Sequence, residues 1–456
     1  MTSTIKVNNV QASDGGNIIN QCGTTITLGA SGDSIALASG ASQTGFGREG
    51  SVDWVTDSIK TATFTAVSGK GYFCNTNGGA FTVNLPAGSA GAIVSVSDYT
   101  RTFNASNLTV SPNGSEKIGG IAADATLTVN GQSATFVYVD GTEGWINVQE
   151  TQTSQTGTTF ITATGGTITT SGNDKIHTFT SPGTFCVSQL ATCSTNNQVS
   201  YIVVAGGGGG GCSGGGGGGA GGFREDKSPA TPYTSSPLEG AGAITVTATG
   251  FPITVGGGGA GGTPGTPATA TPGVNSVFST TTSAGGGGGG SRSGGAPSPA
   301  TANGLSGGSG GGGGGGNPLP NPSGGSGNTP PVSPPQGNNG GGGINSPNHQ
   351  AGGGGGAGGV GTAGTPSPDK GGPGGAGVTT EITASPVARA GGGGGGNQGP
   401  SAGCATAGGG NGGIPSADAT DGTANTGGGG GGAGFRPSQA SGNGGSGVVI
   451  IRYKYQ

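Results

Sequence analysis

The chain has 456 residues, of which 116 are glycine and 27 are proline. Only 7% of its residues are charged, and its formal net charge at pH 7 is −4. No cluster of Lys and Arg offers the basic patch that nucleic-acid binding needs, so we expect no nucleic-acid partner. No apolar run approaches the roughly 18 residues that a membrane-spanning helix requires, so we expect no insertion into a membrane.

Residues 1–45 alternate short apolar segments with polar and glycine breaks, as in STIKVNNV and TTITLGA. Each segment suits one short strand, and none could bury a core alone. Such segments gain stability by winding with copies of themselves or by docking on another protein. The pattern therefore predicts an N-terminal attachment or oligomerisation region.

Residues 46–150 predict a small all-β domain. Short segments such as FTVNLP and SATFVYVD are rich in β-branched and aromatic residues and alternate with period two. Their spacing of roughly 8–12 residues is typical of a sandwich or a barrel. We expect its core and rim to hold Trp54, Phe64, Phe73, Phe81, Phe136, Tyr138 and Trp145.

Residues 151–205 begin with the linker TQTSQTGTT and continue into further strands, and residues 448–456 form a C-terminal strand. Val199–Ala205 and Val448–Tyr455 bracket the glycine-rich residues 206–447. Neither strand could bury its apolar face alone. We therefore expect the two strands to meet and to close one base beneath the glycine-rich region.

The glycine runs recur at a length of about six residues, and segments rich in Pro, Thr, Ser and Asn separate them. Polyglycine can form a polyproline II-type helix with about three residues per turn, whose backbone groups must bond sideways to neighbouring helices. The alternative is a flexible spacer, as in other Gly/Ser-rich chains. The regular run length favours the first, so the predicted fold class is all-β with a C-terminal polyglycine II helix sandwich. The ten glycine-dominated segments lie at residues 206–222, 256–262, 285–290, 310–316, 340–343, 352–359, 391–396, 408–413, 427–434 and 444–447.

An up-and-down arrangement of these segments places loops at both ends of the sandwich. We treat residues 206–222 as one long element, because Cys212–Ser213 is too short to reverse the chain. The loops far from the base are then expected at residues 223–255, 291–309, 344–351, 397–407 and 435–443.

Aromatic and Arg side chains are favoured anchors at interfaces, and the glycine-rich region has few of them. For the two Phe residues in the expected far-end loops, packing on the end of the sandwich is an equal alternative to receptor contact. The candidate contact residues are Phe223, Arg224, Tyr233, Arg292, His349, Phe435 and Arg436.

The glycine runs with variable loops between them resemble the receptor-binding adhesins at the distal tips of T-even-type phage tail fibres. YIVVAGGGGGG and GGSGVVIIRY are similar to a glycine-rich domain of phage and bacterial surface proteins. TIKVNNV, VDWVT and NLPAGSAGAIVSVSDYT are similar to fibre-like virion proteins of marine phages, including cyanophages. The T-even adhesins are short and cap a separate fibre, whereas here an anchor-like region and a β-domain precede the sandwich. Attachment and oligomeric state therefore do not carry over from them.

The resemblance implies a virion protein of the tail fibre or another surface appendage, assembled in the host cytoplasm. Its loops would bind a receptor on the host surface, either a protein or a glycan. Its N-terminal region would join other tail or fibre proteins, and by analogy with fibres the chain would form a homotrimer.

Catalytic motifs are absent from the sequence. The carboxylates are too scattered to name a glycosidase pair, and no Lys follows a glycine run as a phosphate-binding loop requires. We therefore expect no enzymatic activity, catalytic residue, metal or cofactor, and we expect His177 on a strand surface. Cys186 and Cys193 are expected as unpaired thiols rather than a disulfide, because cytosolic assembly keeps thiols reduced.

The sequence thus favours an adhesive virion protein, a tail fibre or its tip. A second hypothesis is a purely structural or decoration fibre of the virion surface without a receptor. A third hypothesis is an enzyme such as a depolymerase, against which the scarcity of acid and base residues argues.

Overall fold

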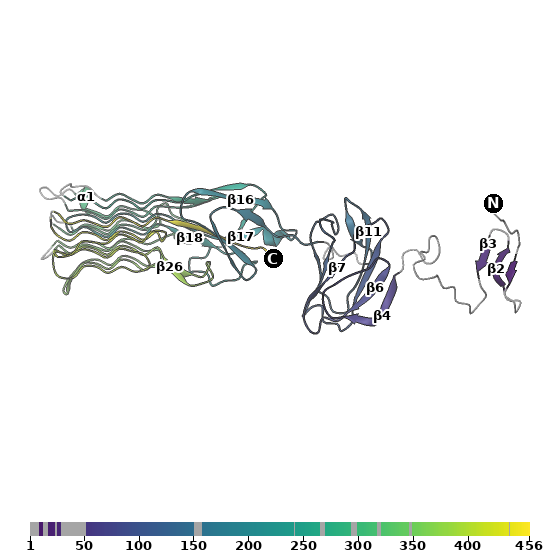
Figure 1. Ribbon diagram of the computed structural model, residues 1–456. Helices are drawn as coiled ribbons and strands as arrows, with labels where there is room; N and C mark the ends of the chain where they lie inside the picture. Colours follow the sequence, from purple (N-terminus) through teal and green to yellow (C-terminus); the bar gives the residue numbers. More distant parts are fainter. Residues whose placement is uncertain are drawn as a thin grey trace. The chain divides into compact units, whose positions relative to one another are not determined.

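The computed structural model is all-β, with one short helix, α1 (Pro299–Ala302), and one 3-10 turn (Ser194–Asn197) among the described residues. The chain divides into two compact units, Met1–Thr156 and Gly157–Gln456, which are treated separately below (Figure 1). The structure describes residues 9–11, 17–22, 25–28, 52–149, 157–240, 242–264, 270–292, 299–316, 321–345, 349–436 and 438–456.

The first strands, β1 (Asn9–Gln11), β2 (Asn17–Cys22) and β3 (Thr25–Leu28), form a three-stranded antiparallel sheet. Most of the region 1–45, for which the sequence predicts attachment or oligomerisation, lies outside the described residues, as do linker residues 151–156.

The rest of the first unit is a two-layered β structure in which the chain alternates between the sheets. In one sheet β4, β6 and β8 are parallel neighbours, and in the other β5, β7 and β9 are. Because successive strands from β4 to β9 alternate between the two sheets, strands within each sheet run parallel and the two sheets face each other as a sandwich. The strands are β4 (Asp53–Lys60), β5 (Phe64–Thr65), β6 (Lys70–Cys74), β7 (Phe81–Asn84), β8 (Ile93–Asp98), β9 (Leu108–Ser111), β10 (Ala125–Leu127), β11 (Ser133–Asp140) and β12 (Gly144–Asn147).

The aromatic residues expected in this domain divide between its core and its rim. Phe81, Phe136 and Trp145 are buried, and Phe64 and Tyr138 pack against that core. Two further aromatic side chains, those of Trp54 and Phe73, pack against each other outside the core cluster, with 4.9 Å between ring centres.

The second unit begins with two sheets that form the base of the glycine-rich region. The first has the order β14-β15-β27-β17-β18, with β19 paired to β17, and the second has the order β13-β16-β20-β21-β22. Phe185, Phe278 and Tyr453 are buried between them. The strands are β13 (Thr162–Thr164), β14 (Thr167–Ser171), β15 (Asp174–Phe179), β16 (Gly183–Gln189), β17 (Gln198–Val204), β18 (Phe223–Asp226), β19 (Ile244–Thr245), β20 (Gly250–Thr254), β21 (Ser276–Phe278), β22 (Thr281–Ser283) and β27 (Val448–Lys454).

β17 and β27 pair antiparallel at the point where the glycine-rich region starts and ends. Val204 lies opposite Val448, so the chain leaves the base and returns to it at one place. This pairing confirms the expected closure of the base. Two small hairpins, β23–β24 and β25–β26, interrupt the glycine-rich region; their strands are Thr365–Pro366, Asp369–Lys370, Val378–Thr380 and Val387–Arg389.

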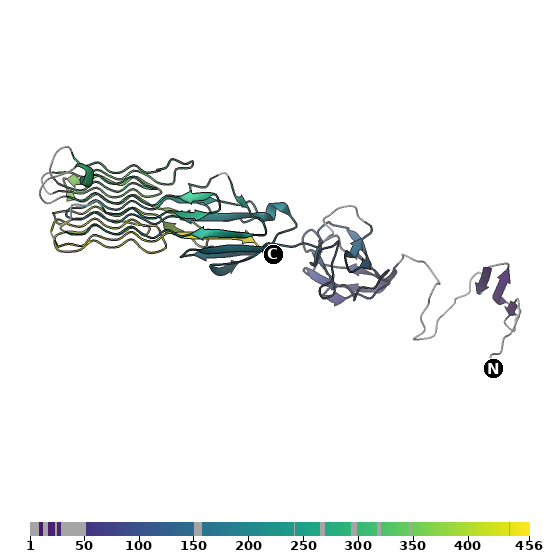
Figure 2. The same ribbon diagram turned by 90° about the horizontal axis from the view of Figure 1, so that it is seen from above.

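Beyond the base the chain forms a slab of extended rods that lie side by side (Figures 1 and 2). The rod at residues 206–211 shows the packing. Its six N–H groups donate in turn to three antiparallel rods, with the same rod recurring at every third residue. Its carbonyls accept from three parallel rods with the same period. The donated bonds are Gly206 to Val274, Gly207 to Gly445, Gly208 to Gly219, Gly209 to Thr271, Gly210 to Gly442 and Gly211 to Gly216, at 2.8–3.0 Å.

A period of three residues with bonds only to neighbours is the geometry of the polyglycine II helix. Every backbone group of this rod is satisfied, although none bonds within the rod. The structure thus confirms the predicted polyglycine II sandwich. Its cohesion comes from lateral backbone hydrogen bonds rather than from an apolar core.

The packing leaves no room for side chains in the middle of the slab. A Cβ on Gly206, Gly207 or Gly208 would lie 2.0, 2.1 and 2.2 Å from a carbonyl oxygen of a different neighbouring rod. At Gly257, which lies on an outer face, a Cβ would meet nothing within 4 Å. Three residues later the same face carries the exposed Ala260. Glycine is therefore required at inner positions and dispensable at outer ones.

One sequence-based expectation about the slab is wrong. Residues 206–222 are not one long element, because the chain reverses at Cys212–Gly214. Gly208 and Gly211 donate to Gly219 and Gly216, so the two halves form an antiparallel pair. Ser213 and Gly214 have φ of 54° and 72°, and this left-handed pair closes the turn in very few residues.

The reversal brings the chain back to the base at residue 223 and shifts the expected positions of the loops. Residues 223–255 lie at the base and not at the far end. Several segments expected as loops are outer rods, in which glycine occupies positions that face the backbone of a neighbouring rod. They include residues 302–308, 360–364, 401–406 and 418–423.

Candidate functional site at the loop end of the slab

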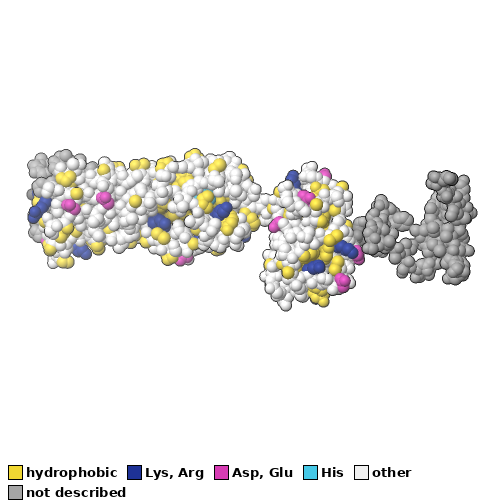
Figure 3. All heavy atoms as spheres, in the orientation of Figure 1, with side chains coloured by type: hydrophobic (Ala, Val, Ile, Leu, Met, Phe, Trp, Pro, Cys, Tyr) yellow, Lys and Arg dark blue, Asp and Glu magenta, His cyan; other side chains and the backbone are white. Residues whose placement is uncertain are grey.

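The loop end is the end of the slab opposite the base sheets. Its described part includes the turn at Cys212–Gly214, the β23–β24 hairpin and the turn at residues 414–417. Figure 3 shows Lys and Arg side chains at this end with Asp or Glu side chains near them, whereas the middle of the slab shows few charged groups.

Three of the candidate contact residues meet at the loop end, although they are far apart in the sequence. The guanidinium carbon of Arg292 lies 4.3 Å from the centre of the Phe435 ring. The ring of His349 stacks on Phe435, with 5.0 Å between ring centres and 30° between planes. We call Arg292, His349 and Phe435 the tip cluster. A cation held over an aromatic face fixes both groups in orientation.

Glycines beside the tip cluster make room for it. A Cβ on Gly316 would lie 2.5 Å from Cδ of Arg292, so the stem of that side chain lies directly on the backbone. A Cβ on Gly214 would lie 3.3 Å from the Phe435 ring. The backbone of His349 is left-handed, with φ of 54°. His349 lies just before the rod that starts at residue 351.

Three polar side-chain atoms of the tip cluster lack hydrogen-bond partners. Nε and Nη1 of Arg292 and Nδ1 of His349 are buried and make no hydrogen bond. Burial lowers the pKa of Arg292. Burial, and then the charge of Arg292, lowers the pKa of His349, while the backbone carbonyl of Asn345 opposes that shift. His349 is therefore neutral at pH 7, and the cluster carries one positive charge.

A second polar group of the loop end contains its own carboxylate. Asp369 accepts hydrogen bonds from the amides of Gln350, at 2.8 Å, and Asn397, at 3.0 Å. Sequence reasoning missed these residues, because single Asn and Gln residues between glycine runs look like ordinary loop residues. The signal that could have found Gln350 is its position directly after His349.

Arg436 is exposed next to the tip cluster, in a loop expected at the far end. Phe223, Arg224 and Tyr233 were expected there too, and for them that placement is wrong. Phe223 is buried in the base, in the apolar cluster that includes Val204, and so only packs against the slab.

Arg224 and Tyr233 have different surroundings at the base. Arg224 lines an open groove of about 280 Å³ with Thr281 and Thr282. The hydroxyl of Tyr233 donates to the buried Glu225 at 3.1 Å, and burial raises the pKa of Tyr233.

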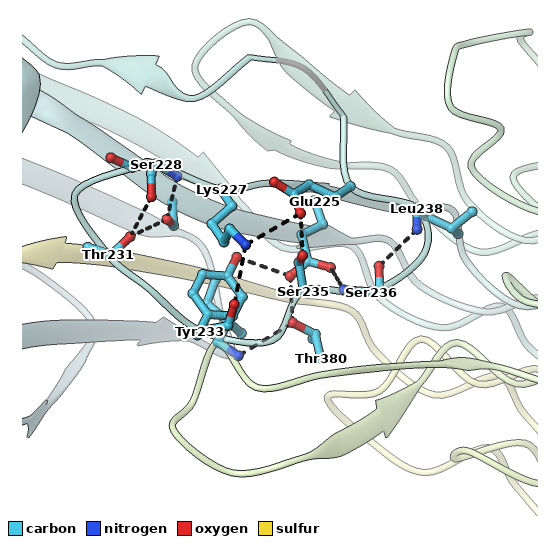
Figure 4. A network of polar contacts seen from close by, with 12 residues as sticks. Glu225, Lys227, Ser228, Thr231, Tyr233, Ser235, Ser236, Leu238 and Thr380 are labelled. Atoms are coloured by element: carbon cyan, nitrogen blue, oxygen red, sulfur yellow. Dashed lines mark hydrogen bonds and ion pairs between the residues drawn. The ribbon is translucent and has the colours of Figure 1, made fainter.

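Glu225 is the centre of a buried polar network (Figure 4). Besides Tyr233, it accepts bonds from the Ser236 backbone N–H, at 2.8 Å, and from the Thr380 hydroxyl. Lys227 bonds the carbonyl of Tyr233 from the same loop. The network ties this loop to the β25–β26 hairpin, so its role is to hold the base together.

His177 was expected on a strand surface, and this expectation is wrong. It lies on β15 but is fully buried, with ring nitrogens 2.7 Å from the Gly165 carbonyl and 3.1 Å from the Tyr453 hydroxyl. Burial lowers its pKa. Cys186 and Cys193 are exposed and not bonded to each other.

Within the described ranges, no group of three or more His, Cys, Asp or Glu side chains is placed to hold a metal ion. None of the helices in the same ranges has the length and apolar character to cross a bilayer.

The comparison with protein families gives a match over the second unit. A family model described as a glycine-rich domain matches residues 180–454, which is more than half of the chain. The chain belongs to the glycine-rich domain family. Compared with the curated proteins, it shows no match.

The glycine-rich domain match starts just after β15 and ends with β27. It therefore contains the complete slab together with the strands that close it. The tip cluster, the Asp369 group and the Glu225 network all lie inside this glycine-rich domain.

Proposed function

We propose that this glycine-rich domain protein is a virion protein, a tail fibre or fibre-tip adhesin, that binds a receptor on the host surface through the loop end of the slab. One observation carries the proposal. The slab brings Arg292, His349 and Phe435 together at the end of its rods, where loops from distant parts of the sequence converge. The resemblance to fibre adhesins supplies the biological setting.

The physical basis is a rigid scaffold that carries variable loops. Rods with fully paired backbone groups give a platform whose loops can change without disturbing its interior. Arg and aromatic side chains are the strongest anchors in protein interfaces. The loop end gathers both kinds in a region otherwise almost devoid of them.

The remaining parts of the proposal follow from the same setting. The N-terminal region joins other tail or fibre proteins, the chain is a homotrimer, and the protein is assembled in the host cytoplasm and carried on the virion. It acts by binding and not as an enzyme.

Competition for adsorption tests the proposal. The purified full-length chain is added to cells of the propagating host before the virus. We expect it to bind the cells and to slow virus adsorption. If the chain neither binds host cells nor slows adsorption, the adhesin proposal is wrong and the non-adhesive fibre is the better description.

Two matched variants locate the contact. Arg436→Gln removes one exposed Arg at the loop end, and Arg224→Gln removes one Arg at the base. Loss of one interface Arg costs about 1–2 kcal/mol, so Arg436→Gln should weaken competition by about tenfold. Arg224→Gln should leave it unchanged; the reverse result would place the contact at the base.

A further inference from the structure

Arg292 takes part in none of the ion pairs found among the described residues. The ion pairs among the described residues are Lys70 with Asp53, Lys227 with Glu239 and Arg452 with Asp174, and none involves Arg292. The segments 293–298, 317–320 and 346–348 follow Arg292, follow Gly316 and precede His349 in the sequence; they read SGGAPS, NPLP and SPN and contain no acidic residue. The chain next to Arg292 and His349 in sequence thus supplies no carboxylate to neutralise this guanidinium.

Two carboxylates described at or next to the loop end already accept hydrogen bonds from within the chain. Asp369 accepts bonds from the amides of Gln350 and Asn397. Asp418, which follows the turn at residues 414–417, accepts a bond from the backbone N–H of Ala440 at 3.3 Å.

Hydrogen bonding to the ends of the rods does not explain the position of Arg292 either. A capping role would require its N–H groups to donate to carbonyls at the ends of the rods. Instead Nε and Nη1 are buried and make no hydrogen bond. Buried donors without acceptors are unfavourable, and an acceptor supplied from outside would remove that cost.

The geometry of the guanidinium defines what the acceptor should be. Nη2 is not among the buried unpartnered atoms. Each of the two bidentate edges of a guanidinium that contain Nη2 also contains Nε or Nη1. An oxyanion that presents two oxygens to one of these edges can therefore engage Nη2 and one of the buried donors together, which is the fork geometry of carboxylate and phosphate recognition.

We propose that the tip cluster is an anion-binding subsite that takes a phosphate or carboxylate group of a host-surface polymer. Phe435 holds the guanidinium from one side, and His349, stacked on Phe435, keeps the ring in place. Arg292 supplies the bidentate donors. The biological part of this inference rests on the proposed function, because it identifies the chemistry that the loop end recognises.

The two histidines of the chain provide an internal control for a binding experiment. His349 belongs to the tip cluster, whereas His177 is buried in the base. Their imidazole signals in a ¹H–¹³C NMR spectrum of the full chain are assigned with His349→Gln. Inorganic phosphate, acetate and uncharged glucose are then titrated at constant ionic strength and pH 7.

We expect phosphate or acetate to shift the His349 signal in a saturable way and to leave the His177 signal in place, while glucose shifts neither. A shift with phosphate alone assigns the subsite to phosphate-bearing polymers, and a shift with acetate alone assigns it to carboxylate-bearing ones. Absence of any His349 shift, or equal shifts of both histidines, would overturn the proposal.

Two substitutions of Arg292 distinguish bidentate hydrogen bonding by the guanidinium from the effect of its positive charge alone. Arg292→Gln should weaken binding at least tenfold, and Arg292→Lys, which keeps the charge but loses the fork, should weaken it to an intermediate degree. Arg224→Gln is the matched control and should bind within about twofold of the unsubstituted chain, because that side chain lies at the base. An unchanged His177 signal verifies that each variant is folded. Equal binding by Arg292→Gln and the parent chain would overturn the proposal.

The adsorption assay distinguishes failure of this inference from failure of the proposed function. If the chain blocks adsorption but its His349 signal ignores both anions, the adhesin stands and the anion subsite falls. If the anions bind but the chain does not attach to cells, the tip cluster is an anion-binding site, but its proposed role in host-surface recognition is wrong.

Discussion

At the scale of single residues, the absence of a side chain is what builds the slab. A Cβ on Gly208 would lie 2.2 Å from the carbonyl oxygen of Gly287, and this oxygen is fixed by the N–H of Gly219. At Gly257 the same atom would meet open space. Two glycines of neighbouring rods thus have opposite tolerance for the same change.

We therefore predict that Gly208→Ala destabilises the second unit by about 3 kcal/mol or more, since the new methyl group forces rigid backbones apart. Gly257→Ala should be neutral or stabilising by up to about 1 kcal/mol, because alanine restricts the unfolded chain more than glycine does. Urea unfolding of both variants measures the difference. Equal destabilisation by the two substitutions would contradict the close packing of rods described here.

The same scale shows what the sequence could reveal about the site. Arg292, His349 and Phe435 were found because rare aromatic and cationic residues stand out against glycine. Their contact with one another could not be predicted, since it depends on which loops are adjacent in the slab. Phe223 has the same chain context as Phe435, and only the direction of its rod places it at the base.

At the scale of the element, the rods follow one rule: bonding directions repeat every third residue, and a residue that faces a neighbouring rod must be glycine. The sequence shows this rule only in part. Inner rods are runs of glycine and are easy to recognise. In outer rods glycine is needed only where a residue faces inward, as with Gly361 and Gly364, whose Cβ atoms would meet carbonyls at 2.1 and 2.4 Å. Such segments look like loops unless the period of three is sought. The turn at Cys212–Gly214 was missed because rods without side chains lie close enough for a very short reversal.

The rule predicts how the rods can be lengthened. The donor and acceptor directions of residues 206–211 repeat every third residue. Three glycines inserted into this rod, with three more in its partner at residues 215–222, should preserve both patterns and extend the hairpin by one turn, roughly 9 Å. One glycine inserted into each rod rotates all following N–H groups away from their acceptors.

We expect the paired three-residue insertion to keep a thermal midpoint within a few degrees of the parent chain, and the paired one-residue insertion to lower it by more than 10 °C, since several buried backbone bonds are lost. Differential scanning calorimetry gives both values. Similar midpoints for the two insertions would rule out a three-residue repeat.

At the scale of the whole molecule, two kinds of stabilisation occur in one chain. The first unit and the base sheets bury apolar side chains such as Trp145 and Tyr453. The slab instead buries peptide groups, and its backbone bonds must offset the large conformational entropy that glycine loses on folding. Sequence composition indicated this division, because apolar residues are few where glycine is abundant.

This division predicts an unusual heat capacity of unfolding. Exposure of apolar surface raises the heat capacity and exposure of polar surface lowers it, and ordinary proteins show a net increase of about 12–15 cal/mol/K per residue. Unfolding of the slab exposes mainly peptide groups, so the value for the full chain should fall clearly below about 12 cal/mol/K per residue. Calorimetry at several pH values, with the enthalpy of unfolding plotted against the midpoint temperature, gives the slope directly. A slope in the ordinary range would mean that apolar burial, and not the lateral hydrogen bonds of the rods, dominates the folded state.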